Sequence, residues 1–313
     1  LSTKYINRLI RDVTEIKANA FYADGGNRGN FPEETDNTII DIPSSVTKIG
    51  NQAFYNRVKV TGLNIQGNSG GLEIGSEAFR GCEQLNALNL NNAKITSLGT
   101  GVFGDCRSMT NEFVDDVLKN YAANGGNYAT DGGKKIPAYL FFGCNGQDGH
   151  DGTVANKNVC AFTALNIPEQ FSVIGDGAFA STGDAVIKLE TITVNRVTAP
   201  TCLCEGKDKY ANVGTKTVFD GVDPNITTVK FANAAEGWNK DQTTGFWTYM
   251  TDNSEFQRLL TKDIYSNKTE YINITYEKLL QDINSLGTML HKKELKRKRV
   301  AIIGKNRYEW SIS

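Results

Sequence analysis

The stretch Ile74-Gly-Ser-Glu-Ala78-Phe79-Arg-Gly-Cys82 decides the fold, because the chain repeats it. A small residue or Leu followed by Phe closes each copy, preceded in most copies by Ile or Leu and Gly. The seven Phe positions are Phe21, Phe54, Phe79, Phe103, Phe141, Phe179 and Phe219. Seven copies of one phrase predict a repeat architecture, in which each unit is a structural turn that cannot bury its apolar side alone.

The spacing of the copies sets the length of one turn. Phe79 follows Phe54 by 25 residues and Phe103 follows Phe79 by 24, whereas the other spacings are 33, 38, 38 and 40. A turn of about 24 residues lies inside the range of leucine-rich repeats, roughly 20–29 residues. The longer turns predict insertions that bulge as loops from the stack, where recognition residues or merely tolerated sequence are found. These insertions are Asp24–Asn37, Asp116–Lys135, Cys144–Cys160 and Ala199–Thr217.

A second element of alternating apolar residues lies between the copies. Its pairs are Ile40/Ile42, Leu63/Ile65, Leu88/Leu90, Leu165/Ile167, Ile192/Val194 and Val229/Phe231. A period of two over so few residues predicts a short strand with one face inward. We expect each turn to contribute one such strand and one Ala-Phe pair. Stacking would align the strands about 4.8 Å apart in a parallel sheet and the Phe rings in one column.

The pattern Ile-Gly-x-x-Ala-Phe-x-x-Cys, followed by Leu-x-x-Leu-x-Leu, resembles the BspA-like leucine-rich repeats of bacterial surface proteins over residues 13–235. The segments Ala232–Trp238 and Phe246-Trp247 resemble the aromatic end of such arrays and predict a cap. The resemblance implies a curved array at the cell surface or secreted, used for adhesion. It would hold a protein or glycan partner through a solenoid face and the inserted loops.

Residues 251–313 have a different character. Leu279, Ile283, Leu286 and Leu290 are spaced as a helix stripe after a candidate N-cap at Thr275, and Val300–Ile303 is typical of a buried strand. This segment resembles the start of adenylate-forming enzymes, especially long-chain acyl-CoA synthetases. The catalytic motifs of those enzymes lie far beyond this portion, so the resemblance implies a truncated segment that is inactive as it stands.

Composition excludes some classes of partner. The 313 residues contain 34 Lys and Arg and 35 Asp and Glu, a net charge of −1, which gives no overall field to recruit nucleic acid. Residues 251–313 hold 12 basic and 8 acidic residues (+4), which leaves 22 and 27 (−5) for residues 1–250. We find no apolar run of about 18 residues that would predict a membrane span. The sequence starts at Leu1 without a leader, as a mature or trimmed chain would.

The cysteines are the first candidate site residues. Cys82, Cys106 and Cys144 share one repeat position and are expected to be buried, inert core thiols, because a zinc site normally needs closely spaced Cys pairs and often His. Cys202-x-Cys204 lacks the two-residue spacer of redox and zinc pairs. A disulfide between either of these and Cys160 stays open.

Other candidate motifs are weaker. The run Asn145–Asp151 carries oxygen ligands that would suit a weak calcium site, although it departs from the EF-hand order and a solvated loop is favoured. Gly214–Thr217 lacks the upstream Gly and the helix of a phosphate loop. Neither His150 nor His291 accompanies a nucleophile signature. The basic run Lys292–Arg299 is typical of a solvated helix end.

We therefore predict an α/β repeat solenoid of the BspA-like leucine-rich type over residues 1–250, and a small helix-strand segment over 251–313. The predicted function is non-catalytic binding, with no catalytic, cofactor or metal residues. Two alternatives remain at this point. The chain could be a fragment of an ATP-dependent acyl-CoA synthetase, or the array could only space other domains of an exported protein.

Overall fold

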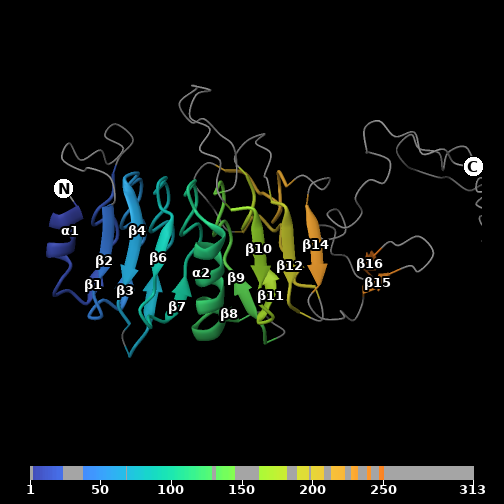
Figure 1. Ribbon diagram of the computed structural model, residues 1–313, viewed down its shortest axis with the longest axis horizontal. Helices are drawn as coiled ribbons and strands as arrows, with labels where there is room; N and C mark the ends of the chain where they lie inside the picture. Colours follow the sequence, from blue (N-terminus) through green and yellow to red (C-terminus); the bar gives the residue numbers. More distant parts are fainter. Residues whose placement is uncertain are drawn as a thin grey trace, which may run out of the picture. The chain divides into compact units, whose positions relative to one another are not determined.

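The computed structural model describes residues 3–23, 38–67, 69–128, 132–144, 162–181, 189–196, 199–207, 213–222, 227–231, 238–240 and 247–249. Between Thr3 and Phe231 these residues form a solenoid of parallel strands whose turns stack along one axis (Figure 1). The predicted leucine-rich-repeat solenoid is confirmed. Residues 250–313 lie outside the described residues, and with them the predicted helix near Leu279–Leu290 and the strand Val300–Ile303.

Each of the first turns contributes two strands, one to each of two parallel sheets, and not the single strand that we expected. The strand before each Ala-Phe pair lies in a sheet with the order β1 (Glu15–Ile16), β3 (Lys48–Ile49), β5 (Leu72–Ile74), β7 (Ile95–Leu98). The alternating strands form the second sheet, β2 (Thr38–Ile42), β4 (Val60–Ile65), β6 (Ala87–Asn89). Apolar alternation did not predict the first set of strands, because a strand of two to four residues is too short to show a period of two.

Two further sheets continue the array beyond Asn124. One holds β8 (Asn127–Tyr128), β9 (Lys134–Ile136), β11 (Phe171–Ile174) and β13 (Thr201–Cys202), in which β8 and β9 are antiparallel. The other holds β10 (Ala164–Ile167), β12 (Thr191–Val194) and β14 (Thr228–Phe231), all parallel. Two more strands, β15 (Trp238–Lys240) and β16 (Trp247–Tyr249), pair antiparallel at the aromatic end segment. Their side chains lie outside the description, so the predicted cap remains a prediction.

The insertion predicted at Asp116–Lys135 is not a loop. Residues from Asn111 to Asn124 form helix α2, which begins at an N-cap, Thr110, whose side chain accepts a hydrogen bond from Phe113 N. One face of α2 is buried in the core: Phe113, Val114, Val117, Leu118, Tyr121 and Ala122. The helix packs against β6, β7 and β10 and so takes the place of a strand in the second layer (Figure 1). The expectation of a bulge was wrong because this segment carries its own apolar stripe.

The insertion at Ala199–Thr217 also differs from a simple bulge. Its start, β13, pairs in parallel with β11 and extends the sheet. Asp176, which is buried, accepts hydrogen bonds from the backbone N–H groups of Glu205 (3.0 Å) and Gly206 (2.7 Å). Further along, Val213 packs on a small apolar cluster of Ala138, Tyr139, Phe142 and Ala180. Most of the other two predicted insertions, 24–37 and 145–160, lies outside the described residues.

The core is organised around one column of Phe rings. Neighbouring rings from Phe21 to Phe219 are stacked with centroids 5.2–5.8 Å apart and interplanar angles of 2–19°. The five central rings, from Phe54 to Phe179, are at most 1% exposed. The predicted column is confirmed at all seven positions, including the loosely matching copies at Phe141 and Phe219. One continuous core therefore runs through the array, as a solenoid requires.

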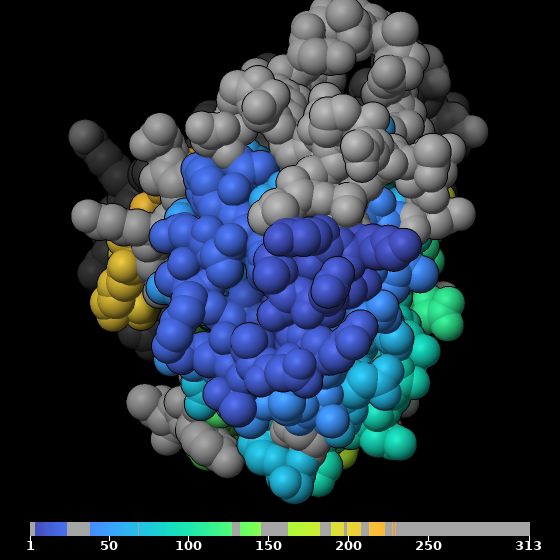
Figure 2. Space-filling model, turned by 90° about the vertical axis from the view of Figure 1, so that its left-hand side faces the viewer, coloured from blue at the N-terminus to red at the C-terminus, as the bar shows by residue number. Residues whose placement is uncertain are grey.

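Helix α1 (Thr3–Leu9) closes the first end of the array and lies beside β2. Ile6 and Ile10 are buried, and the side chain of Asn7 imitates a neighbouring strand. Its Nδ2 donates to the carbonyl of Ile39 (2.9 Å), and its Oδ1 accepts from the N–H of Asp41 (3.1 Å). This is the pattern in which one residue of a parallel strand bonds its neighbour. The edge of β2 is thus protected from pairing with another chain. Figure 2 faces this end and shows it covered by the N-terminal residues in blue.

Candidate binding surfaces

The Ala-Phe turns form one side of the array, which we call the turn edge. In the four turns around Phe54, Phe79, Phe103 and Phe141 the backbone adopts a left-handed conformation two residues before Phe and again two residues after it. Around Phe79 these residues are Glu77 (φ 55°) and Gly81 (φ 72°), and around Phe103 they are Gly101 (φ 62°) and Asp105 (φ 59°). From Phe21 to Phe179 the N–H of each Phe of the column donates to the next turn, as Phe54 N does to Ala78 O at 2.7 Å. The turn edge is therefore a third hydrogen-bonded ladder beside the two sheets.

The Gly of the repeated phrase is needed for close approach between turns. A Cβ on Gly75 would lie 2.5 Å from Asn51 Oδ1 and 2.7 Å from Asn51 N in the preceding turn. The equivalent Gly175 would meet Ala138 N at 2.5 Å. Neither residue has a positive φ, so the constraint is space and not backbone conformation. This explains why Ile-Gly recurs in the sequence.

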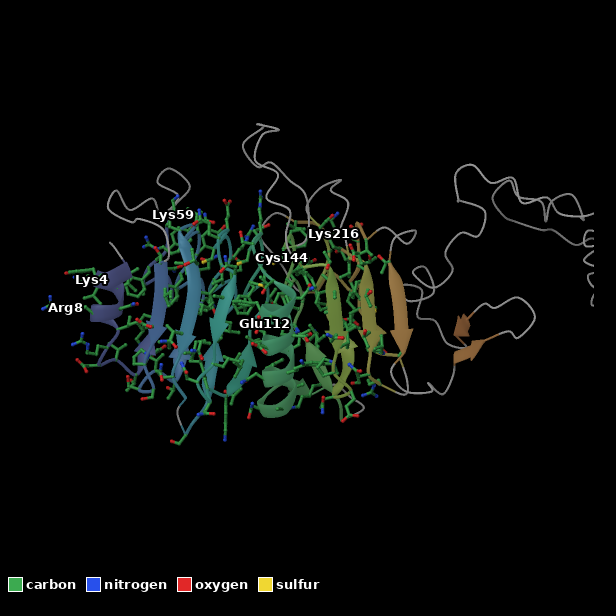
Figure 3. The ribbon with its side chains drawn as sticks, viewed as in Figure 1. Lys4, Arg8, Lys59, Glu112, Cys144 and Lys216 are labelled. Carbon is green, nitrogen blue, oxygen red and sulfur yellow. The ribbon has the colours of Figure 1, made fainter. Side chains whose placement is uncertain are left out.

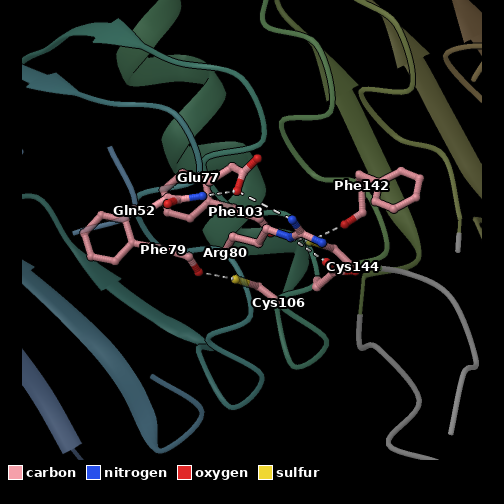
Figure 4. A network of polar contacts seen from close by, with 9 residues as sticks. Gln52, Glu77, Phe79, Arg80, Phe103, Cys106, Phe142 and Cys144 are labelled. Carbon is pink, nitrogen blue, oxygen red and sulfur yellow. Dashed lines mark hydrogen bonds and ion pairs between the residues drawn. The ribbon is translucent and has the colours of Figure 1, made fainter. Parts of the chain in front are cut away.

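The three cysteines of the repeat position form a buried column, as predicted. Each thiol donates to the carbonyl of the Phe one turn earlier: Cys82 to Phe54 (3.4 Å), Cys106 to Phe79 (3.1 Å) and Cys144 to Phe103 (2.9 Å). Figure 4 shows the bond from Cys106. In the second turn Arg57 occupies this position and its Nε donates to Phe21 O in the same way. Burial raises the pKa of Cys82 to about 12 and that of Cys106 well above its usual value. At neutral pH these thiols are structural donors and not nucleophiles.

A row of aromatic and charged side chains covers the first half of the turn edge, at the position directly after Phe. Tyr22 and Tyr55 are stacked, with centroids 4.8 Å apart and an interplanar angle of 10°. The guanidinium of Arg80 lies over the ring of Tyr55, 5.4 Å from its centroid. Burial raises the pKa of Tyr55, whereas Tyr22 at the end of the row is 40% exposed. We call these three residues the Tyr–Arg row.

Polar neighbours fix the guanidinium of Arg80. Its Nε binds Asp105 Oδ2 at 3.0 Å and its Nη1 lies 3.5 Å from Glu77 Oε2, while Gln52 Nε2 donates to the same Glu77 oxygen at 2.8 Å (Figure 4). These four residues come from three successive turns. A cation held by two carboxylates and an aromatic ring is preorganised, which lowers the entropy lost when a partner binds.

The outward face of the sheet β2–β4–β6 carries a second surface, which we call the amide row. Asp41, Asn64 and Asn89 are register partners across the three strands, and Asn7 and Asn91 continue the row on either side. Asp41 accepts from Asn7 Nδ2 (2.9 Å) and from Asn64 Nδ2 (2.8 Å), and Asn91 Nδ2 donates to Asn64 Oδ1. A similar contact recurs beyond α2, where Asn166 Nδ2 donates to Asp115 at 3.0 Å.

Sequence analysis did not select the residues of either surface, although a signal for them exists. In β2, β4 and β6 the amide row occupies the position between the two alternating apolar residues: Asp41, Asn64 and Asn89. The Tyr–Arg row follows the residue after Phe. Periodicity identified the apolar positions of each repeat. The outward residues are their immediate neighbours in sequence, which must be aligned from repeat to repeat in the same way.

The remaining candidate residues that the structure describes, Cys202, Cys204 and Lys216, contribute to neither surface (Lys216 is labelled in Figure 3). Cys202 is half-buried and Cys204 exposed near β13, and Cys160 lies outside the described residues, so the disulfide alternatives stay open. Lys216 of the Gly214–Thr217 run forms an ion pair with Asp220 (2.8 Å), and no helix follows it within the described residues. Three further candidates fall outside the description: the Asn145–Asp151 run with His150, His291, and Lys292–Arg299.

The residues that the structure describes contain neither a cluster of metal ligands nor a membrane-spanning helix. Within the ranges that the structure describes, no three His, Cys, Asp or Glu side chains gather as a metal site would require. Over the same ranges, neither helix has the length and apolar character to cross a bilayer.

Comparison with known proteins supports the repeat assignment. Residues 27–124 match the family model of the BspA type leucine rich repeat region, with six copies. This segment lies within the solenoid and contains Tyr55, Arg80 and most of the amide row. A search of curated proteins finds no match to the chain. The resemblance of residues 251–313 to acyl-CoA synthetases receives no support from either comparison.

Proposed function

We propose that this chain is a non-catalytic binding scaffold that acts at a cell surface or after secretion and holds a protein or glycan ligand on its solenoid surfaces and inserted loops. The match of residues 27–124 to a BspA-type repeat supports a binding role. The architecture supports it physically, because a continuous core with three hydrogen-bonded ladders is a rigid support. Rigid supports hold recognition groups in place and so reduce the entropy lost on binding.

The observation that carries the proposal is the Tyr–Arg row. Tyr and Arg are enriched among residues that dominate protein–protein affinity. Here Tyr22 is exposed at the end of a fixed stack that continues through the half-buried Tyr55 and Arg80. The row also lies next to inserted sequence. Ala23 and Cys144, the last described residues before the insertions at 24–37 and 145–160, both follow directly on an Ala-Phe turn. Ligand contacts would therefore concentrate on the turn edge.

The proposal is tested with the full chain immobilised on a surface and probed with extracellular-matrix proteins and with oligosaccharides. We expect specific capture of at least one class, and loss of at least tenfold in affinity for a captured protein in Tyr22→Ala. Lys48→Ala, an exposed substitution on the sheet β1–β3–β5–β7, is the matched control and should bind as the wild type. Capture unchanged in Tyr22→Ala would remove the turn edge from the site. No capture of either class would overturn the binding function.

A further inference from the structure

The outward face of β2–β4–β6 has two parallel rows of different chemistry. One is the amide row, and the other is apolar and consists of Ile39, Gly62 and Ala87, which are register partners across the three strands. Ile39 is 47% exposed. Because neighbouring strands are about 4.8 Å apart, each row offers one group per strand along the axis of the array. The face is thus a flat strip, apolar on one side and hydrogen-bonding on the other.

The amide row keeps unused hydrogen-bonding capacity toward solvent. An ionised carboxylate has about four acceptor sites and an amide nitrogen two donor hydrogens. In the described contacts the Asp41 carboxylate accepts two hydrogen bonds, and Asn64 Nδ2 donates one. Asn91 Nδ2 likewise donates once, to Asn64. The internal bonds fix the orientation of the amides, and the exposed Asp41 and Asn91 keep further acceptors and donors for a ligand.

The charge of the face selects a class of ligand. In β2, β4 and β6, whose residues the structure describes in full, Asp41 is the only ionisable side chain. These strands also contain none of the Tyr, Trp or Arg residues that typically anchor a protein partner. Polyanions find no cation on the strands. Hydroxyl groups, which donate and accept at once, match a row that mixes carboxylate and amide groups.

Gly62 lies at the centre of the apolar row and is itself buried between its register partners Ile39 and Ala87. A Cβ at this position would lie 3.4 Å from Ile39 Cγ1 and 3.5 Å from the Ala87 Cβ, which are ordinary contact distances. The φ of Gly62 is not positive, so a larger residue is compatible with the strand. This Gly is therefore required neither by close approach nor by backbone conformation, unlike Gly75. Its effect is to leave no side chain between Ile39 and Ala87, where a larger residue would stand in the way of a ligand.

We propose that the β2–β4–β6 face binds a neutral, linear oligosaccharide that lies along the array. The ring C–H groups of the sugar contact the exposed Ile39 and Ala87 on either side of Gly62, and its hydroxyls bond to Asp41, Asn64 and Asn91. This inference rests on the proposed binding function and deepens it by naming a ligand class for one face. It leaves the Tyr–Arg row to a protein partner.

Calorimetric titration of the full chain with cellohexaose, laminarihexaose and maltohexaose tests the proposal. We expect at least one hexasaccharide to bind, and a tenfold or greater loss of affinity in Asn64→Ala and in Gly62→Val. Thr193→Val, at the equivalent outward position of β12, is the control and should bind as the wild type. Thermal unfolding of each variant verifies that the array is intact.

The proposal is overturned if none of the three hexasaccharides binds, if Gly62→Val and Asn64→Ala bind as the wild type, or if Thr193→Val weakens binding equally. Stronger binding of a polygalacturonate hexamer would also overturn it, because the face would then prefer an anion. Protein capture that persists without hexasaccharide binding would leave the proposed function intact and reject this inference alone.

Discussion

The turn edge and the two sheets respond differently to the same insertion. Between Phe103 and Phe141 the chain adds α2 and β8, and neither β7 nor β6 pairs with a strand of the next turn. Yet Phe103 and Phe141 stack at 5.8 Å with an interplanar angle of 9°, and Phe103 N donates to Leu140 O at 3.1 Å. The ring column and the turn ladder therefore continue across the insertion, whereas both sheets end there. Continuity of this array depends on the turn edge, and the sheets tolerate replacement.

The sheets tolerate it because α2 satisfies the exposed strand edges with Asn side chains. Asn120 accepts from Ile95 N (2.8 Å) and donates to Ala93 O (2.8 Å), the same pattern with which Asn7 binds β2. On the other side of the helix, Asn111 Oδ1 accepts from the N–H groups of Thr163 (2.8 Å) and Ala164 (2.9 Å). A buried backbone group needs a partner, and an amide side chain supplies both a donor and an acceptor.

The largest effect is expected in the ring column at the interrupted turn. Phe103 stacks on Phe79 and Phe141 and meets Phe113 of α2 edge-on at 5.4 Å. Phe103→Ala should lower the free energy of unfolding by about 4 kcal/mol, since it leaves a cavity where three elements meet. Chemical denaturation followed by circular dichroism measures this. Tyr5→Ala, at a side chain 49% exposed, is the control. A loss below about 1 kcal/mol for Phe103→Ala would contradict the importance of the column.

The next effect concerns the close packing of turns. Gly75→Ala should cost about 2–3 kcal/mol, because its Cβ would overlap the backbone of Asn51 and force the turns apart. The matched control is Gly214→Ala, whose Cβ would meet nothing within 4 Å. Equal thermal stability of the two variants would show that the turns have room to separate.

Asn120→Ala separates the role of α2 in the sheets from its role in the core. The substitution leaves Ile95 N and Ala93 O without their side-chain partner, so we expect a loss of about 1–2 kcal/mol. Asn124→Ala, one helical turn later on an exposed side chain, should cost less than about 0.5 kcal/mol. Hydrogen exchange at Ile95 should accelerate in Asn120→Ala only. Unchanged exchange there would mean that α2 holds the edge through its apolar face alone.

The smallest effect at neutral pH is expected for Cys82→Ala, and it changes with pH. The thiol has a pKa of about 12 in the fold and near 9 when exposed, so the folded state holds the proton more tightly. This contribution is complete below pH 9 and is lost as the pH rises toward 12. Wild type should therefore lose its advantage over Cys82→Ala between these values, as measured by urea denaturation at pH 7, 9 and 10.5. Parallel curves for the two proteins would contradict burial of the thiol.

Much of the fold could be predicted from particular residues. The Phe of every copy has the same surroundings in the core. Phe219 therefore belongs to the column, although its copy retains little else of the repeated phrase. The strand positions followed from alternation, as at Leu63 and Ile65. The helix was also legible, because Thr110 and the spacing of Phe113, Val117 and Tyr121 are typical of a capped amphipathic helix. An interpretation that assigns every inserted residue to a loop overlooks this helix.

The candidate surfaces were less accessible to prediction. Tyr22, Tyr55 and Arg80 are separated by 33 and 25 residues, and only the stacking of turns places them in one row. The same holds for Asp41, Asn64 and Asn91. The sequence shows that each repeat has polar or aromatic residues at outward positions. The register between turns determines which of these residues contact each other.

The sequence by itself determined the repeat, the seven-membered Phe column and the burial of Cys82, Cys106 and Cys144, because burial follows from a local pattern that each turn repeats. Only the tertiary structure decided that each of the first turns has two strands, that α2 replaces a strand, and that the polar side chains form an ordered strip. Those outcomes depend on hydrogen bonds between turns, which join residues 23 or more positions apart, and no local pattern specifies such partners.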